Sequence, residues 1–335
     1  MTFQETGIAF QTDKTPSEYR ALAALVDHFG FDVLSVYGDL PYQPSFSALL
    51  LMTSELRRAR LGPACISPSR MTPTDVAGEL SLLDWLSDGR AYLGVARGAW
   101  LSRHGIRERT PFLAAIRETI EITQRLLLGI DDAYEGQVFK IAAGVRLPYP
   151  VRRTRIPILI GTWGEKMAGL AGELADEVKL GGCANPDMIP VVRRWIAEGE
   201  RRAGRPPGSC QVVVGAVTVV DEDRRAARAY VKRDLALYLP MVAALDPTIQ
   251  IEPELLEQIG ALVAINEQNK AAALISDDIL AKFALAGLPA EVLAQAQALY
   301  DAGAKRVEFG TPHGLRAADG IELLGKRVLP GLQLR

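Results

Sequence analysis

The sequence predicts an α/β fold, a (β/α)8 TIM barrel, on three observations. Short apolar segments alternate with helical segments, eight apolar segments can be counted, and the length of 335 residues lies within the range of such barrels. This alternation requires a parallel sheet with helical crossovers, and eight strands close a barrel without an exposed edge. We expect one domain over residues 1–335, because no Ser/Gly-rich linker or low-complexity tract divides the chain.

The expected strands and helices follow one another in strict order. The apolar residues of segment 16–30 recur at helical spacing, and Gly30 ends this helix as a C-terminal glycine does. The helix over 74–86 opens after Thr72 and Pro73, the order typical of a helix start. The expected strands are 7–11, 33–37, 59–66, 91–95, 158–161, 177–180, 211–220 and 306–309. The other expected helices are 46–56, 112–128, 165–175, 187–203 and 318–328.

Two segments interrupt the alternation. Residues 134–147 are typical of a hairpin, and residues 221–288 are too long for a single crossover. We expect both to be insertions that act as lids or as packing elements.

Composition excludes several classes of protein. Lys and Arg number 38 against 40 Asp and Glu, and this near-neutral balance argues against a nucleic-acid partner. The amino terminus lacks the pattern of a signal peptide, and no run reaches about 18 apolar residues, so we expect a cytoplasmic protein without membrane contact. Cys65, Cys183 and Cys210 have no CxxC spacing, so neither a disulfide framework nor a metal site is expected.

In barrels of this kind the active site lies at the carboxyl ends of the strands. No carboxylate pair, histidine cluster or nucleophile triad stands at these positions. The residues that follow the expected strands are Ala9, Gln11, Gly38, Asp39, Ala64, Cys65, Ser67, 97–100, 162–164, 181–183 and 310–314.

Two glycine-containing turns have alternative interpretations. Residues Gly161 to Gly164 join a buried strand to a helix amino terminus, where backbone N–H groups can hold a phosphate, or the glycines only allow a tight turn. Gly98 lets a planar ligand approach the backbone and Arg97 can meet an anion, or both belong to an ordinary surface loop.

Four side chains near strand ends could take part in chemistry. Asp39 can orient a ring nitrogen or move a proton, or can cap a turn. His104 and His313 lie in loops after expected strands, and solvated loop positions are the favoured interpretation for both. Cys65 has no identifiable partner base, which favours a core or pocket-lining residue over a nucleophile.

Several segments together resemble the bacterial-luciferase-like superfamily of barrel oxidoreductases. These segments are 30–32, 60–63, 82–95, 156–161 and 171–178. Within that superfamily, segments 161–167, 309–314 and 323–330 are most similar to the methylenetetrahydromethanopterin reductase branch, which uses the deazaflavin coenzyme F420. The likeness spans nearly the whole chain.

The resemblance implies a cofactor over the barrel mouth, F420 in the reductase branch or FMN in monooxygenases of the same superfamily. Its phosphate would lie near the turn 161–164, and its ring would lie against the third strand, where relatives carry a non-proline cis peptide at the place of Ala64–Cys65. A small-molecule substrate and a homodimer or homotetramer are implied as well. The cofactor-binding residues so implied are Asp39, Ala64, Cys65, Arg97, Gly98, Gly161, Thr162, Trp163, Gly164, Gly181 and Gly182.

The sequence departs from its relatives at two acidic positions. Ala9 stands where the reductase branch has an acid on the first strand, and Ala99 stands where F420-using relatives have one after the fourth. Protonating a product nitrogen or oxygen needs a donor. Asp39 is the candidate catalytic residue, with water, His104 or His313 as the alternatives. A barrel that lost catalysis and kept binding is the third hypothesis, besides F420 and FMN enzymes.

Overall fold

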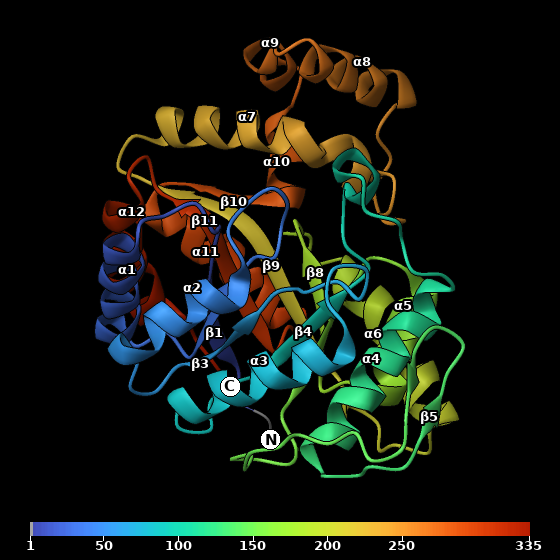
Figure 1. Ribbon diagram of the computed structural model, residues 1–335. Coiled ribbons are helices and arrows are strands. Elements are labelled where there is room, and N and C mark those ends of the chain that lie inside the picture. Colours follow the sequence, from blue (N-terminus) through green and yellow to red (C-terminus); the bar gives the residue numbers. More distant parts are fainter. Residues whose placement is uncertain (1–2) are drawn as a thin grey trace.

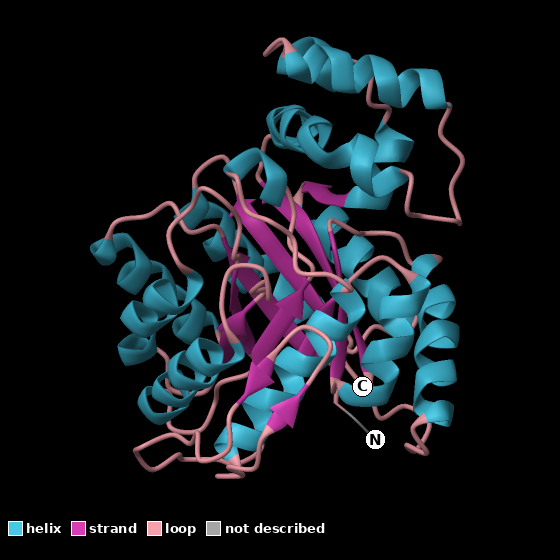
Figure 2. Ribbon diagram, turned by 45° about the vertical axis from the view of Figure 1, so that its right-hand side comes forward, coloured by secondary structure: helices cyan, strands magenta, loops and turns pink. Residues whose placement is uncertain are grey.

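The computed structural model describes residues 3–335 and contains the expected barrel (Figures 1 and 2). Over these residues eight parallel strands run in the order β3-β2-β1-β11-β9-β8-β7-β4. Parallel bridges Leu61–Ala91 and Ile66–Val95 join β3 to β4, so the sheet closes on itself and the predicted fold class is confirmed. The strands are β1 (Glu5–Phe10), β2 (Val33–Val36), β3 (Arg60–Pro63), β4 (Leu93–Ala96), β7 (Ile158–Gly161), β8 (Glu177–Gly181), β9 (Gln211–Val220) and β11 (Arg306–His313).

Helices surround the barrel, and their ends follow local sequence signals. Thr15 caps α1 in a reciprocal arrangement with Glu18, and Gly30 ends it in the left-handed conformation at φ 75°. Thr72 and Asp75 cap α3 in the same way. The outer helices are α1 (Pro16–Phe29), α2 (Ser45–Met52), α3 (Pro73–Leu86), α4 (Phe112–Leu127), α5 (Glu165–Leu174), α6 (Met188–Arg202), α11 (Pro289–Asp301) and α12 (Ala317–Leu323).

Four predicted boundaries were wrong by three or more residues. The second helix ends at Met52 rather than at residue 56 and continues as a 3-10 turn over Thr53–Glu55. The third strand ends at Pro63, because the chain leaves the ladder with β2 there and Ile66 pairs only with Val95 of β4. The last strand extends to His313, which pairs with Val219 of the long strand β9. The final helix ends at Leu323 and continues as a π-helical turn over Leu324–Val328.

Both predicted insertions are present. The first contains an antiparallel hairpin of β5 (Tyr134–Glu135) and β6 (Lys140–Ile141). The second contains α7 (Arg224–Ala243), α8 (Pro253–Ala264), α9 (Gln268–Ala273), α10 (Asp277–Phe283) and β10 (Ala284–Gly287). β10 adds a ninth strand beside the outer part of β9. α7 lies across the end of the barrel opposite the chain termini, which is where the strands end (Figure 1).

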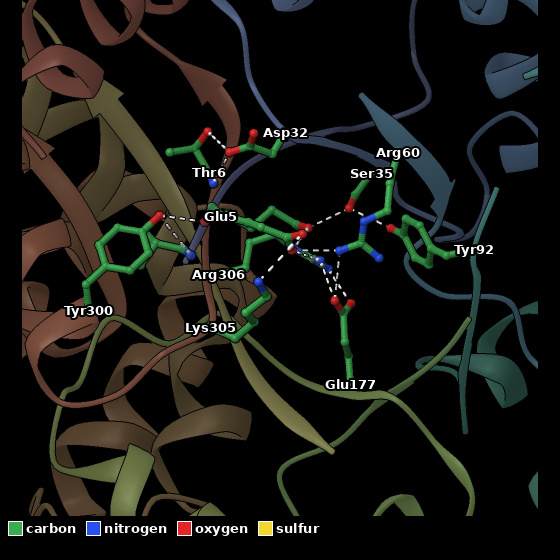
Figure 3. Close-up of polar contacts among 12 residues, drawn as sticks. Glu5, Thr6, Asp32, Ser35, Arg60, Tyr92, Glu177, Tyr300, Lys305 and Arg306 are labelled. Carbon is green, nitrogen blue, oxygen red and sulfur yellow. Dashed lines mark hydrogen bonds and ion pairs between the residues drawn. The ribbon is translucent and has the colours of Figure 1, made fainter. Parts of the chain in front are cut away.

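The interior of the barrel holds charged side chains (Figure 3). Near the amino ends of the strands, the buried Arg306 guanidinium pairs with Glu177, 2.9 Å between Nη2 and Oε2, and Arg60 donates to the same carboxylate at 3.0 Å. Burial opposes the charge, but Arg306 and Arg60 outweigh it and hold the pKa of Glu177 below its usual range. Each of these buried charges thus has an opposite charge beside it.

None of the helices within residues 3–335 combines the length and the apolar content that crossing a membrane requires.

Candidate active site

Asp39 lies just beyond β2, where hydrogen bonds join it to the neighbouring loops. The Gln11 Nε2 group, just after β1, donates to Asp39 Oδ2 at 3.0 Å. The Arg70 guanidinium donates to the carbonyl oxygen of Gly38. Asp39 is therefore held at the carboxyl ends of the strands, where its Oδ2 atom accepts a hydrogen bond.

Cys65 projects into the barrel among glycines of the neighbouring strands. A Cβ on Gly161 would lie 2.9 Å from Cys65 Sγ, and one on Gly94 would lie 3.3 Å from it, so glycine at both positions makes room for the thiol. The cis peptide predicted at Ala64–Cys65 is present. Burial raises the pKa of the Cys65 thiol to about 12 despite the nearby Lys179 ammonium, so the thiol is neutral. The Cys65 thiol forms an uncharged floor of the barrel mouth and does not act as a nucleophile.

A buried ion pair lies beneath this floor. Lys179 of β8 pairs with Glu308 of β11, and the Lys179 ammonium lies 5.2 Å from the centre of the Tyr37 ring. Ser35 donates to Glu308 and also contacts the Tyr92 hydroxyl at 2.6 Å. Burial, and then the charges of Glu308 and Asp39, raise the pKa of Tyr37. The interior of the barrel beneath Cys65 is therefore polar. Lys179 and Glu308 pair with each other, and Tyr37 keeps its proton.

The turn from Gly161 to Gly164 leads into α5. The Thr162 hydroxyl accepts from the Gly164 N–H at 2.9 Å, and Trp163 Nε1 donates to the Gly181 carbonyl oxygen at 2.7 Å, which ties this turn to the end of β8. Gly164 is the N-cap of α5 and has no side chain to cap it. The first N–H groups of α5 thus remain free to bind an anion.

Gly181 and Gly182 leave the end of β8 accessible in different ways. A Cβ on Gly181 would meet no atom within 4 Å, whereas one on Gly182, at φ +73°, would lie 3.2 Å from the Tyr238 ring of α7. Helix α7 therefore contacts Gly182 and leaves open space beside Gly181.

Arg97 and Gly98 are fixed to the loop after β3. The Ser67 hydroxyl donates to the Arg97 carbonyl oxygen at 2.7 Å, and a Cβ on Gly98 would lie 2.9 Å from Ser67 Oγ. The Arg97 guanidinium pairs with Glu108 and lies 4.8 Å from the centre of the Phe112 ring. An anion at Arg97 would have to compete with the Glu108 carboxylate.

The interpretation of His313 as a solvated loop residue was wrong. His313 is fully buried at the end of β11, and its Nε2 lies 3.1 Å from the carbonyl oxygen of Ala9. A carbonyl oxygen only accepts, so Nε2 carries the proton. Burial lowers the pKa of His313 to about 3, so the ring is neutral and has no proton to give from Nδ1. His104 and Ala99 are exposed in the loop after β4.

Sequence reasoning missed the charges inside the barrel and the contribution of α7. A signal existed for the first, since Lys179 and Glu308 stand on strands where charged and apolar residues alternate, and barrel strands are buried on both faces. No comparable signal marks Tyr238, because nothing in the insertion indicates which face of α7 covers the mouth.

The family is decided by comparison with known proteins. The profile of the family described as luciferase-like monooxygenase matches residues 1–306. The chain belongs to this family. Its members include F420-dependent and flavin-dependent oxidoreductases, and the resemblance seen in the sequence is confirmed.

The similarity extends over whole chains. The 5,10-methylenetetrahydromethanopterin reductase of Archaeoglobus fulgidus is 30% identical, covering 98% of this chain and 99% of the relative. The structure of the coenzyme F420-dependent tetrahydromethanopterin reductase of Methanopyrus kandleri superposes with a TM-score of 0.89 at 26% identity, covering 98% and 99%. A type II Baeyer-Villiger monooxygenase from Pseudomonas putida in complex with FMN reaches 0.69 at 16% identity, covering 99% and 100%, a likeness of fold alone.

Proposed function

We propose that this protein is an F420-dependent oxidoreductase that transfers a hydride between the deazaflavin and a small organic substrate. The observation that carries the proposal is the full-length likeness to the F420-dependent reductase of Methanopyrus kandleri, with a TM-score of 0.89. The FMN-containing relative covers the chain equally well but with a TM-score of 0.69. The substrate is a further proposal, and a reduced pterin that carries a methylene group is the first to test.

The residues at the mouth fit such a cofactor. The uncapped amino end of α5 and the turn from Gly161 to Gly164 suit a phosphate, because free N–H groups and the helix dipole both favour negative charge. Open space beside Gly181 leaves room next to that turn. The neutral Cys65 thiol, set among glycines, suits the face of an uncharged planar ring.

When bound, F420 would supply a ring carbon that accepts or gives a hydride. The chain's own residues have other tasks. Gly161 and Gly94 leave room for the Cys65 thiol. The thiol and its backbone would then lie close under the ring and set how deeply the ring enters the barrel. Asp39, held by Gln11, would accept a hydrogen bond from a ring N–H and so fix the ring's orientation. Trp163 holds the turn 161–164, where the phosphate would bind, to the end of β8.

Cofactor binding tests the proposal directly. Purified protein would be titrated with F420 and, separately, with FMN, followed by fluorescence quenching and by retention of absorbance through gel filtration. Binding of F420 alone supports the proposal. Binding of FMN alone would move the protein to the monooxygenases of the family, and binding of neither would favour a barrel that has lost its redox cofactor.

A further inference from the structure

The mouth lacks an evident proton donor. Ala9 and Ala99 have no acidic group, and His313 is neutral, with its one N–H directed to the Ala9 carbonyl oxygen. Asp39 already accepts from Gln11, in the place suited to orienting a ring. Reduction of a C=N or C=O bond delivers a hydride to carbon and leaves the heteroatom in need of a proton.

Helix α7 brings a phenol to this mouth. The Tyr238 ring packs over Gly182, where a Cβ would lie 3.2 Å from its Cε2 atom. Gly181, the residue before Gly182, accepts the hydrogen bond of Trp163, so Tyr238 packs next to the residue that the turn 161–164 contacts.

The Tyr238 hydroxyl has no hydrogen-bond partner among residues 3–335, although it is buried. A buried hydroxyl without a partner costs about 1 to 3 kcal/mol, and such groups in proteins normally have a partner, which can be water or a ligand. The Tyr238 hydroxyl is therefore available to form a hydrogen bond with a ligand atom.

Asp234 lies one helical turn before Tyr238, on the same face of α7. Its side chain is partly buried and forms no ion pair or hydrogen bond within the described part of the chain. Burial raises the pKa of Asp234, an effect that the neighbouring Arg233 only partly opposes. Burial, and then the Asp234 charge, raise the pKa of Tyr238 as well. The raised pKa means that the Tyr238 phenol is protonated near neutral pH, as a proton donor must be.

We propose that Tyr238 donates the proton to the substrate heteroatom, and that Asp234 replenishes it. This inference rests on the proposed function. In a pterin with a bridging methylene group, the bridge carbon has single bonds to two nitrogens. One nitrogen takes a proton as its bond to this carbon breaks, and the iminium carbon that remains accepts the hydride of the reduced deazaflavin. That proton comes from Tyr238, and the Asp234 carboxylate then relays a proton from water to the phenolate. The substrate is reduced by two electrons and the deazaflavin is oxidised by two.

The test uses three variants of the full chain. Tyr238→Phe removes only the hydroxyl, and Asp234→Asn removes the acid and keeps the shape. Tyr230→Phe is the matched control, since it makes the same change two turns earlier on α7, where the Arg233 guanidinium lies 5.0 Å from the ring centre.

The first readout is binding, observed by NMR on protein labelled with ¹³C at the ζ carbon of tyrosine. The chain has nine tyrosines, and the resonance absent from Tyr238→Phe belongs to Tyr238. Addition of 5,10-methylenetetrahydromethanopterin to the F420-bound protein should shift that resonance and leave that of Tyr230 in place. An unmoved Tyr238 resonance would overturn the inference.

The second readout is turnover of the same pterin with reduced F420, followed by absorbance. Tyr238→Phe should lose about 10²-fold in kcat, the usual contribution of a general acid, with F420 affinity unchanged. Asp234→Asn should lose less, and Tyr230→Phe nothing. Full activity of Tyr238→Phe, or a shifted resonance without turnover by the unaltered protein, would overturn the proton role. Failure of the unaltered protein to bind F420 would instead remove the proposed function, and this inference with it.

Discussion

Lys179 and Glu308 form an ion pair across the inside of the barrel, with 5% and 0% of their side chains exposed. Strand β9 lies between the strands that carry them, and its Gly215 leaves the space that the pair needs. A Cβ there would lie 2.9 Å from Lys179 Cε. One glycine thus allows two charges from separate strands to meet directly beneath the mouth.

Breaking this pair should destabilise the protein strongly. Lys179→Met leaves the buried Glu308 carboxylate with only the Arg306 guanidinium, 3.7 Å away, as counter-charge, and breaking a buried pair of this kind costs about 3 to 5 kcal/mol. We expect urea unfolding to show a loss of that size. Lys326→Met is the control, since its pair with Glu322 is 59% and 50% exposed and an exposed pair of this kind contributes little to stability. Equal losses in the two variants would contradict the role of burial.

The contact between Gly161 and Cys65 predicts a non-additive pair of substitutions. Gly161→Ala would place a methyl group 2.9 Å from Cys65 Sγ, and overpacking of this kind costs about 1 to 3 kcal/mol. Cys65→Ala removes the sulfur, so the double variant should recover most of the loss that Gly161→Ala causes. The free energies of unfolding of the parent, the two single variants and the double variant form a cycle. A cycle that closes additively would rule out the contact.

His313 predicts a stability that falls in acid. Burial lowers its pKa from 6.5 to about 3 in the folded state, so below pH 6.5 the unfolded chain takes up a proton that the folded chain does not. This group's contribution is complete above about pH 6.5 and is lost as the pH falls toward 3. His313→Gln keeps an N–H for Ala9 and should flatten the decline in urea-unfolding free energy between pH 7 and pH 4. His104→Gln, a change in an exposed loop, should decline in parallel with the parent.

The sequence predicted the architecture more completely than the details of the site. Apolar runs of the correct number and order predicted the eight strands, because a barrel buries both faces of each strand. The end of β3 at Pro63 was missed, since Ala64 and Cys65 are as apolar as the strand before them and only pairing shows where it stops. The burial of His313 was missed because β11 continues through a Gly-Thr-Pro segment that is typical of a turn.

All three cysteines should resist thiol reagents in the folded protein. Burial raises the pKa of Cys65 and of Cys183 to about 12, and that of Cys210 further still. The thiolate is the reactive form, so a disulfide reagent at pH 8 should label none of them within minutes, whereas the unfolded chain should react at all three. Rapid labelling of one thiol per chain, lost in Cys65→Ser, would show that the floor of the mouth is open and its thiol activated.

Trp163 links the predicted phosphate turn to β8, and this link should contribute to cofactor affinity. Trp163→Phe keeps an aromatic ring and removes the N–H that donates to the Gly181 carbonyl oxygen at 2.7 Å. One hydrogen bond contributes about 0.5 to 1.5 kcal/mol, so the dissociation constant of F420 should rise by about 2- to 10-fold if the turn must be ordered for binding. Trp85→Phe removes a comparable bond, to the Pro150 carbonyl oxygen at 3.0 Å, on the outer helix α3 and should leave the constant unchanged. Fluorescence titration of both variants measures the difference, and equal affinities would mean that the turn holds its shape without the indole.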